Sequence, residues 1–204
     1  MDAALTQAGQ RVSLAAADAM APLAQGKLDG LCGLYAIINA LRLTAWPHKV
    51  LTYTDSKALF SFGTKFLHRR RQLKHVIRDG MPASLWRELA DAVAAEAEPR
   101  AGIALAVLPY DAEPNSTDTT QLFDFIHSML MAQRPVLIEL GNCYRHYTVI
   151  AGISAARLEL FDSWGYAHIH RNACGYGPVA RQRHALAHAM AIYSAYPTPL
   201  PSFR

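Results

Sequence analysis

The sequence has few of the features that mark secreted or membrane-spanning proteins. Its three cysteines cannot all pair within the chain, so at least one thiol must stay free. Free thiols are typical of a reducing compartment, and we expect the protein in the cytoplasm of the producing cell. The Ala-rich stretch 1–25 has no basic start and is interrupted by charged residues. Export would therefore require a route that needs no cleaved signal peptide.

Long apolar runs and long charge runs are also missing. No stretch of about 18 consecutive apolar residues occurs, so we expect no membrane span. Hydrophobic residues make up 51% of the chain and charged residues 18%, which excludes a disordered class. The length of 204 residues favours a single domain over 1–204. The formal charge of +4 is too low to predict nucleic acid as a partner.

Helical periodicity dominates the first half of the chain. Apolar residues recur at spacings of three and four, with Pro and Gly at the ends of the patterns. One face of a further helix could be formed within 1–25. The helices expected beyond it are 33–43, 55–77 with a possible break at Gly63, 82–97 stopping at Pro99, and one that opens with a capping box at Asp118 and ends before Pro135.

The second half changes to short apolar runs separated by turn residues, a pattern typical of strands. We expect a helix over 178–193, although the pattern there is ambiguous. The strands expected are 103–108, 136–140, 147–153 and 158–161. The whole pattern predicts an α+β fold, with a helical lobe over about 1–100 packed on an antiparallel β-sheet lobe over about 101–204. Active sites often lie between two such lobes.

Cys32 has the sequence context of a nucleophile. A Gly-rich loop leads directly into the apolar helix expected from Gly33, which places Cys32 at the helix N-terminus. Unpaired N–H groups at that end favour negative charge, and the thiolate is the reactive form of cysteine. Gln25 lies in the same loop, and its amide could donate to an oxyanion together with the Cys32 N–H.

Two further residues could complete a catalytic centre. His146 stands at the entrance of the strand 147–153, and Asp162 follows the next strand. Antiparallel neighbours of this kind bring the start of one strand and the end of the next to the same edge of the sheet. We therefore expect His146 to serve as the base for Cys32, with Asp162 holding the imidazole in the required tautomer.

The order of these motifs resembles that of the papain-like cysteine peptidases. The residues that carry the resemblance are Gln25-Gly26, Cys32-Gly33 at the head of a helix, and Asp162-Ser163-Trp164-Gly165, which differs from Asn-Ser-Trp-Gly at its first residue. The run His146-Tyr147-Thr148-Val149-Ile150 is also similar to the peptidase domains that trim leader peptides in bacterial peptide exporters. The resemblance implies a papain-like fold and a Cys-His-Asp triad.

The sequence thus predicts a hydrolase that cleaves a peptide, isopeptide or related amide bond through an acyl-enzyme on Cys32. No cofactor or metal ion is implied. The pairs Cys143–His146 and Cys174–His170 lack the spacing of a structural zinc site, and no phosphate-binding loop occurs. An acyltransferase of the transglutaminase type, with the same Cys-His-Asp order, is one alternative.

The other alternative is a catalytically silent papain-like module that docks a partner. Cationic side chains are concentrated in the segment 66–78, whose apolar residues fall near helical spacing. We interpret this segment as the polar face of an exposed helix, and we expect the patch at residues 69–71 to lie off the catalytic cleft. Arg69, Arg70 and Arg71 could alternatively form a patch for an acidic partner.

Overall fold

A computed structural model describes residues 11–27, 29–110, 119–142, 144–177 and 184–194. The α-helices are α2 (Ala15–Ala19), α3 (Cys32–Ala45), α4 (Tyr53–Arg69), α5 (Leu73–Asp79), α6 (Ala83–Ala101) and α7 (Thr120–Met131). The strands are β1 (Val12–Ser13), β2 (Leu105–Pro109), β3 (Val136–Leu140), β4 (His146–Ile153), β5 (Arg157–Leu160), β6 (His168–His170), β7 (Cys174–Tyr176) and β8 (His184–Ser194). A short 3₁₀ turn, Arg171–Ala173, joins β6 to β7.

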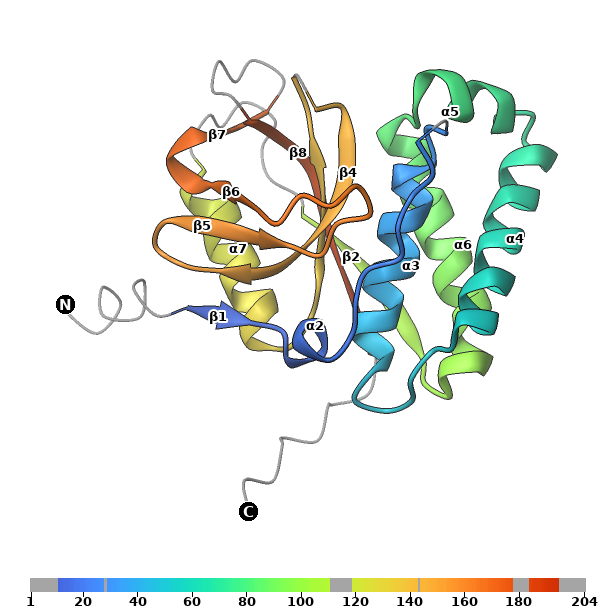
Figure 1. Cartoon of the computed structure of the whole chain (residues 1–204), viewed down its shortest axis with the longest axis horizontal. Helices are drawn as coiled ribbons and strands as arrows, with labels where there is room; N and C mark the ends of the chain where they lie inside the picture. The colour runs from blue at the N-terminus through green and yellow to red at the C-terminus, as the bar shows by residue number, and fades with distance from the viewer. Residues whose placement is uncertain (1–10, 28, 111–118, 143, 178–183, 195–204) are drawn as a thin grey trace.

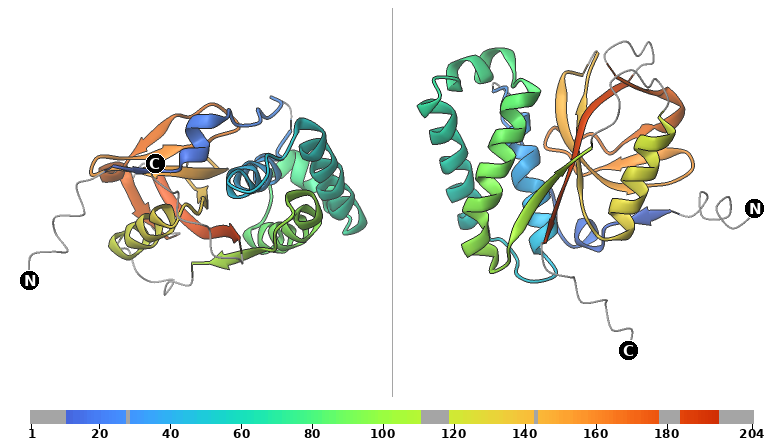
Figure 2. Two further views of the ribbon diagram at one scale, coloured as in Figure 1. Left: turned by 90° about the horizontal axis from the view of Figure 1, so that it is seen from below. Right: turned by 180° about the vertical axis from the view of Figure 1, so that it is seen from behind.

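The architecture is α+β, with an open antiparallel sheet beside a group of helices (Figure 1). The strand order is β2-β8-β3-β4-β5-β6; β1 adds to β4, and β7 pairs with β8 in the one parallel pairing among the described strands. Helices α3, α6 and α7 contact the sheet, while α4 packs with α3 and α6 (Figure 2). Buried apolar side chains from both parts form one continuous core.

The long helical segment expected over 55–77 is divided, but not at Gly63. Gly63 lies inside α4, where an added Cβ would overlap the side chain of Leu34, so this glycine lets α4 approach α3 closely. The break falls at 70–72 instead, where Arg71 adopts a left-handed conformation with φ of 59°. The prediction of a break was right, and its position was wrong.

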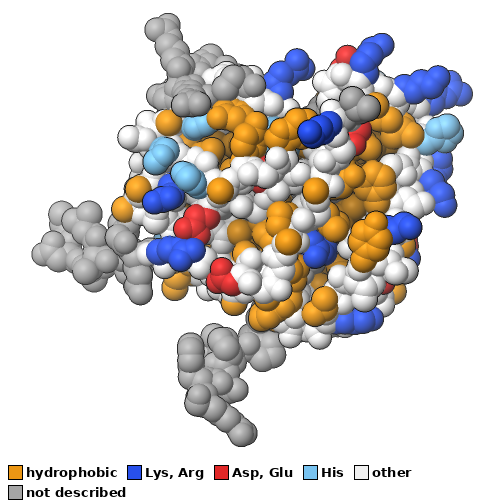
Figure 3. All heavy atoms as spheres, in the orientation of Figure 1, with side chains coloured by type: hydrophobic (Ala, Val, Ile, Leu, Met, Phe, Trp, Pro, Cys, Tyr) orange, Lys and Arg blue, Asp and Glu red, His pale blue; other side chains and the backbone are white. Residues whose placement is uncertain are grey.

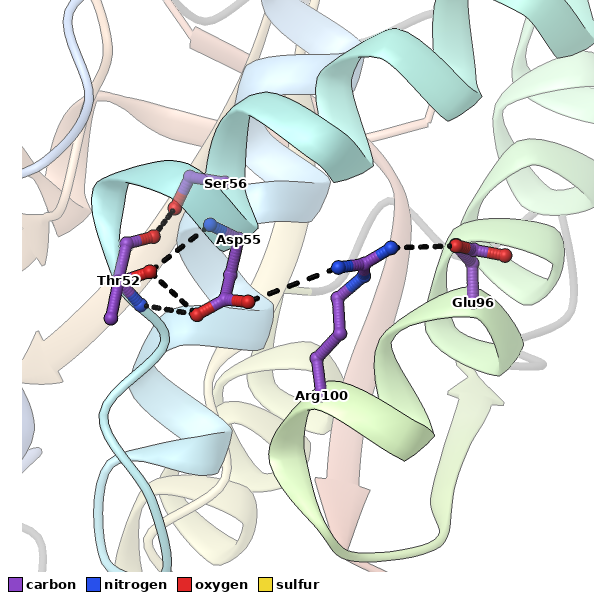
Figure 4. Close-up of polar contacts among 5 residues, drawn as sticks. All are labelled: Thr52, Asp55, Ser56, Glu96 and Arg100. Atoms are coloured by element: carbon purple, nitrogen blue, oxygen red, sulfur yellow. Dashed lines mark hydrogen bonds and ion pairs between the residues drawn. The ribbon is translucent and has the colours of Figure 1, made fainter.

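Helix α6 also runs past the residue that was expected to stop it. Pro99 lies in the last turn of α6, and the helix ends at Gly102, which has φ of 72° and donates its N–H to the carbonyl of Glu98. Just before this end, Arg100 contacts Glu96 at 3.1 Å and Asp55 at 3.9 Å (Figure 4). Asp55 belongs to the capping box that starts α4, so these contacts join the start of α4 to the end of α6.

Two segments differ in type from the sequence prediction. The part of 178–193 that the structure describes is strand β8, not helix, and it lies between β2 and β3. The described part of 1–25 forms β1 and the short helix α2 rather than one long helix. The expected capping residue Asp118 lies outside the described residues, and Thr119, which precedes α7, makes no side-chain cap.

The other expected elements are confirmed with small shifts in their ends. Strand β3 has the predicted bounds, whereas β2, β4 and β5 begin or end one or two residues away from them. Within the described part of the chain, no helix combines the length and apolar character that a bilayer crossing requires.

Candidate active site

Cys32 is the first residue of α3, as its sequence context predicted. The preceding loop is fixed by Asp29, whose carboxylate accepts a 3.0 Å hydrogen bond from the backbone N–H of Leu31. No side chain caps the helix at Leu31, and the N–H of Leu34 bonds to the Leu31 carbonyl. The N–H groups of Cys32 and Gly33 are therefore the ones that can stabilise negative charge at Cys32. Cys32 as a whole residue is 7% exposed and is therefore largely shielded from bulk water.

His146 and Asp162 reach one edge of the sheet from neighbouring antiparallel strands. β4 begins at His146, and Asp162 follows β5, whose register with β4 pairs Ile150 with Leu160. The Nε2 atom of His146 lies 2.6 Å from Oδ2 of Asp162, and both side chains are buried. The structure thus brings together two residues that sequence reasoning paired.

The second carboxylate oxygen of Asp162 is bound by the backbone. Its Oδ1 accepts hydrogen bonds from the N–H of Trp164 at 2.8 Å and of Tyr166 at 3.0 Å. Burial raises the pKa of this carboxyl, but the hydrogen bond and charge of His146 and the backbone N–H of Tyr166 bring the pKa below its ordinary value. Asp162 is therefore held in one orientation as an anion.

Cys32 is the third member of this cluster, because its side chain interacts with the imidazole of His146. Since Asp162 occupies Nε2, the nitrogen left for the thiol is Nδ1. Burial lowers the pKa of His146, but hydrogen bonds to Asp162 and Cys32, with the charges of both, raise it to about 9. At neutral pH the imidazole is therefore protonated and lies between two potential anions.

The two halves of the cluster are connected through a buried ring that sequence reasoning missed. Trp86 of α6 donates its indole N–H to the carbonyl of Gly33 at 3.0 Å and packs on Tyr147, with ring centroids 4.1 Å apart. A Cβ on Gly33 would approach both rings to 3.1–3.3 Å. The residues that follow Cys32 and His146 are thus packed on one another. No local motif marks Trp86, because only tertiary packing gives it this place.

Aromatic rings also flank the imidazole. The rings of Trp164 and Tyr166 meet that of His146 edge to face, at centroid distances of 6.4 and 5.8 Å. Trp164 is 49% exposed, so it forms part of the rim. Beside it lies an open pocket of about 370 Å³, formed by residues of 22–27 and 162–165. Trp164 could be found from the sequence through its motif, whereas Tyr166 could not.

Gln25 is held in the loop before Cys32, and its amide is occupied locally. The amide Nε2 donates to the carbonyl of Asp29 at 2.5 Å and to the Asp29 carboxylate at 3.1 Å. Its backbone N–H donates to the carbonyl of Ser163 at 2.9 Å, which ties the loop to the segment after β5. An oxyanion role for Gln25 would require its amide to exchange Asp29 for the substrate.

The remaining cysteines differ from Cys32. Cys174 is buried in β7, its thiol donates to the carbonyl of His170 at 3.2 Å, and burial raises its pKa to about 12. Cys143 lies outside the described residues. Among the residues that are described, no three His, Cys, Asp or Glu side chains are grouped as metal ligands.

The basic segment lies nearer to this site than the sequence suggested. Its second half forms α5, and the carbonyl of Ile77 in α5 accepts a 3.0 Å hydrogen bond from the N–H of Gly30. α5 thus contacts the loop that leads to Cys32, whereas Arg69, Arg70 and Arg71, which were expected to lie off the catalytic cleft, precede α5 in the chain.

The chain matches no family model, no curated protein and no solved structure. The geometry and chemistry of the site are therefore the grounds on which a function can be assigned.

Proposed function

We propose that the protein is a cysteine-nucleophile hydrolase of the papain-like kind, which cleaves a peptide, isopeptide or related amide bond. One observation carries the proposal: buried His146 interacts with both Asp162 and Cys32, although the three residues come from separate segments of the chain. A nucleophile, a base and a residue that orients the base are the elements of covalent acyl transfer.

In the proposed reaction the thiolate of Cys32 attacks the carbonyl carbon of the substrate. As the C–N bond breaks, the His146 imidazolium gives its Nδ1 proton to the leaving amine, and the acyl group remains as a thioester. Neutral His146 then takes a proton from water, which attacks the thioester; the C–S bond breaks, and the carboxylic acid product leaves. Asp162 keeps Nε2 protonated throughout, so that Nδ1 is the nitrogen that exchanges protons.

The tetrahedral intermediates carry a negative oxygen that needs hydrogen-bond donors. The backbone N–H of Cys32, at the uncapped start of α3, is one such donor. The amide of Gln25 is the proposed second donor, released from Asp29 when substrate enters. The pocket lined by Trp164, whose ring contacts that of His146, leaves room for part of a peptide substrate.

Selective alkylation tests the nucleophile. Iodoacetamide at pH 6 should label Cys32 to one equivalent, well before Cys174, which is buried and hydrogen-bonded. His146→Ala should slow this labelling, because the imidazolium that stabilises the thiolate is lost. Cys174→Ser is the matched control and should leave the Cys32 rate unchanged. Labelling of Cys32 no faster than that of free cysteine would refute the nucleophile assignment.

Digestion of a proteome-derived peptide library, read by mass spectrometry, tests the reaction itself. Wild-type protein should generate new peptide ends, and Cys32→Ala should generate none while keeping its circular dichroism spectrum. Incorporation of a biotinylated primary amine in place of water would identify a transglutaminase-type acyltransferase. No product of either kind would favour a silent module that docks a partner through 66–78.

A further inference from the structure

Helix α5 and the loop before Cys32 form one structural unit. Besides the hydrogen bond from Gly30 to Ile77, the two backbones touch so closely that a Cβ on Gly30 would overlap the carbonyls of Val76 and Ile77. Only a glycine fits there. A ligand bound on the outer surface of α5 is therefore a neighbour of the loop that positions the nucleophile.

That surface is strongly basic. We call "basic face" the six exposed cations at the end of α4 and on α5: Lys65, Arg69, Arg70, Arg71, Lys74 and Arg78. Figure 3 shows Lys and Arg side chains gathered at the upper right, where Figure 1 places α5 and the adjoining end of α4.

Acidic partners neutralise only part of the basic face. Arg70 pairs with Glu88, and Arg78 pairs with Asp79, which also contacts His75. The other four cations make no ion pair with any described residue. This part of the surface therefore carries uncompensated positive charge, which attracts anions over roughly 10 Å at ordinary salt.

Cations also border the site away from α5. Lys27 is exposed in the loop between Gln25 and Cys32 and lines the pocket beside Trp164. Arg145 is exposed directly before His146, with φ of 43°. Asp29, in the loop that contains Lys27, accepts hydrogen bonds from Gln25 and from the backbone N–H of Leu31. Positive charge is thus present in the loop before Cys32 and directly before His146.

We propose that the basic face docks an acidic peptide segment and so selects substrates that carry Asp and Glu residues near the bond to be cleaved. The proposal rests on the proposed function, because it assumes that the occupant is the substrate of Cys32. A peptide fits better than a nucleic acid because the neighbouring Cys32 site has the groups for amide chemistry. Electrostatic complementarity of this kind raises association rates and excludes basic competitors.

Fluorescence anisotropy with a fluorescein-labelled decaglutamate peptide tests the docking. Two double variants serve as a matched pair: Arg71→Glu with Lys74→Glu on the basic face, and Lys49→Glu with Arg157→Glu away from it. Lys49 follows the opposite end of α3 from Cys32, and Arg157 starts β5 at the end remote from Asp162. Either pair brings the formal net charge from +4 to 0, so only the position differs.

In 20 mM salt, we expect decaglutamate to bind the wild-type protein and the Cys32→Ala variant equally well. The basic-face variant should bind about tenfold more weakly, while the control should change less than twofold. Equal losses in both variants, or no binding by the wild type, would overturn the proposal. Tighter binding of a ten-nucleotide oligothymidylate than of decaglutamate would overturn it in favour of nucleic acid.

Protection of Cys32 then tests whether docking occurs beside the site. Saturating decaglutamate should slow iodoacetamide labelling of Cys32 at least threefold in the wild type, and less in the basic-face variant. Binding without protection would refute docking at the cleft. If Cys32 is unreactive with and without the peptide, the proposed catalytic function fails, while the anisotropy result decides separately whether the basic face binds acidic peptides.

Discussion

The indole N–H of Trp86 donates a hydrogen bond of 3.0 Å to the carbonyl of Gly33, the residue directly after Cys32. The same ring packs on Tyr147, the residue directly after His146. One buried side chain of α6 thus positions both members of the Cys32–His146 pair from behind.

Replacing this ring should disturb the site more than its effect on stability explains. Trp86→Phe removes the indole hydrogen bond to the Gly33 carbonyl, and we expect the free energy of unfolding to fall by about 1–3 kcal/mol. The labelling rate of Cys32 should also drop. Leu89→Ala, a buried change on the same helix, should cost about 2–5 kcal/mol yet leave the labelling rate unchanged. Equal effects of both variants on labelling would show that Trp86 contributes only to core stability and does not position the site.

The protonation of His146 gives a pH dependence of stability. Folding raises the pKa of His146 from 6.5 to about 9, so its contribution to stability is fully present below pH 6.5 and is lost as the pH rises through about 9. Urea unfolding between pH 6 and 10 should show this decline for the wild type and a flatter profile for His146→Ala. Turnover of an amide substrate should fall over the same pH range, because the neutral imidazole can no longer protonate the leaving amine. Parallel stability profiles for the two proteins would contradict the assignment.

The two oxygens of Asp162 have different partners, which separates the effects of two substitutions. Asp162→Ala removes the acceptor for both His146 and the N–H groups of Trp164 and Tyr166, and should lower turnover about 10⁴-fold. Asp162→Asn keeps one oxygen and should be milder. Without the negative charge, the pKa of His146 should fall, so the pH above which turnover declines should move from about 9 towards neutrality. Turnover measured across pH for both variants checks this. If turnover of Asp162→Asn still declines at about pH 9, a role for the charge is excluded.

The oxyanion role of Gln25 can be separated from its structural role. Gln25→Ala should slow the chemical step by roughly a hundredfold, with little change in KM. Asp29→Asn keeps oxygen acceptors for Gln25 and Leu31, so it serves as the control for a loosened loop and should have a smaller effect on turnover. A rise in KM at constant turnover in Gln25→Ala would make Gln25 a substrate contact instead.

Where local patterns matched the tertiary environment, the sequence was sufficient. α3 and β3 follow from their apolar residues and flanking turn residues, because nearly all residues of both elements are buried, as such apolar segments require. The order of Cys32, His146 and Asp162, and the local setting of each, were likewise readable from the chain. Neighbouring antiparallel strands must bring the start of one and the end of the next together.

Other features were decided only by tertiary structure. β8 is Ala-rich and resembles a helix, yet it forms a strand because β2 and β3 supply hydrogen-bond partners on both of its edges. Gly63 was expected to break a helix and instead allows close packing on Leu34. The sequence alone specified which residues could perform thiol chemistry. The contact of His146 with Asp162, the buried ring of Trp86 and the basic helix beside the Cys32 loop depend on long-range packing, which no local pattern encodes.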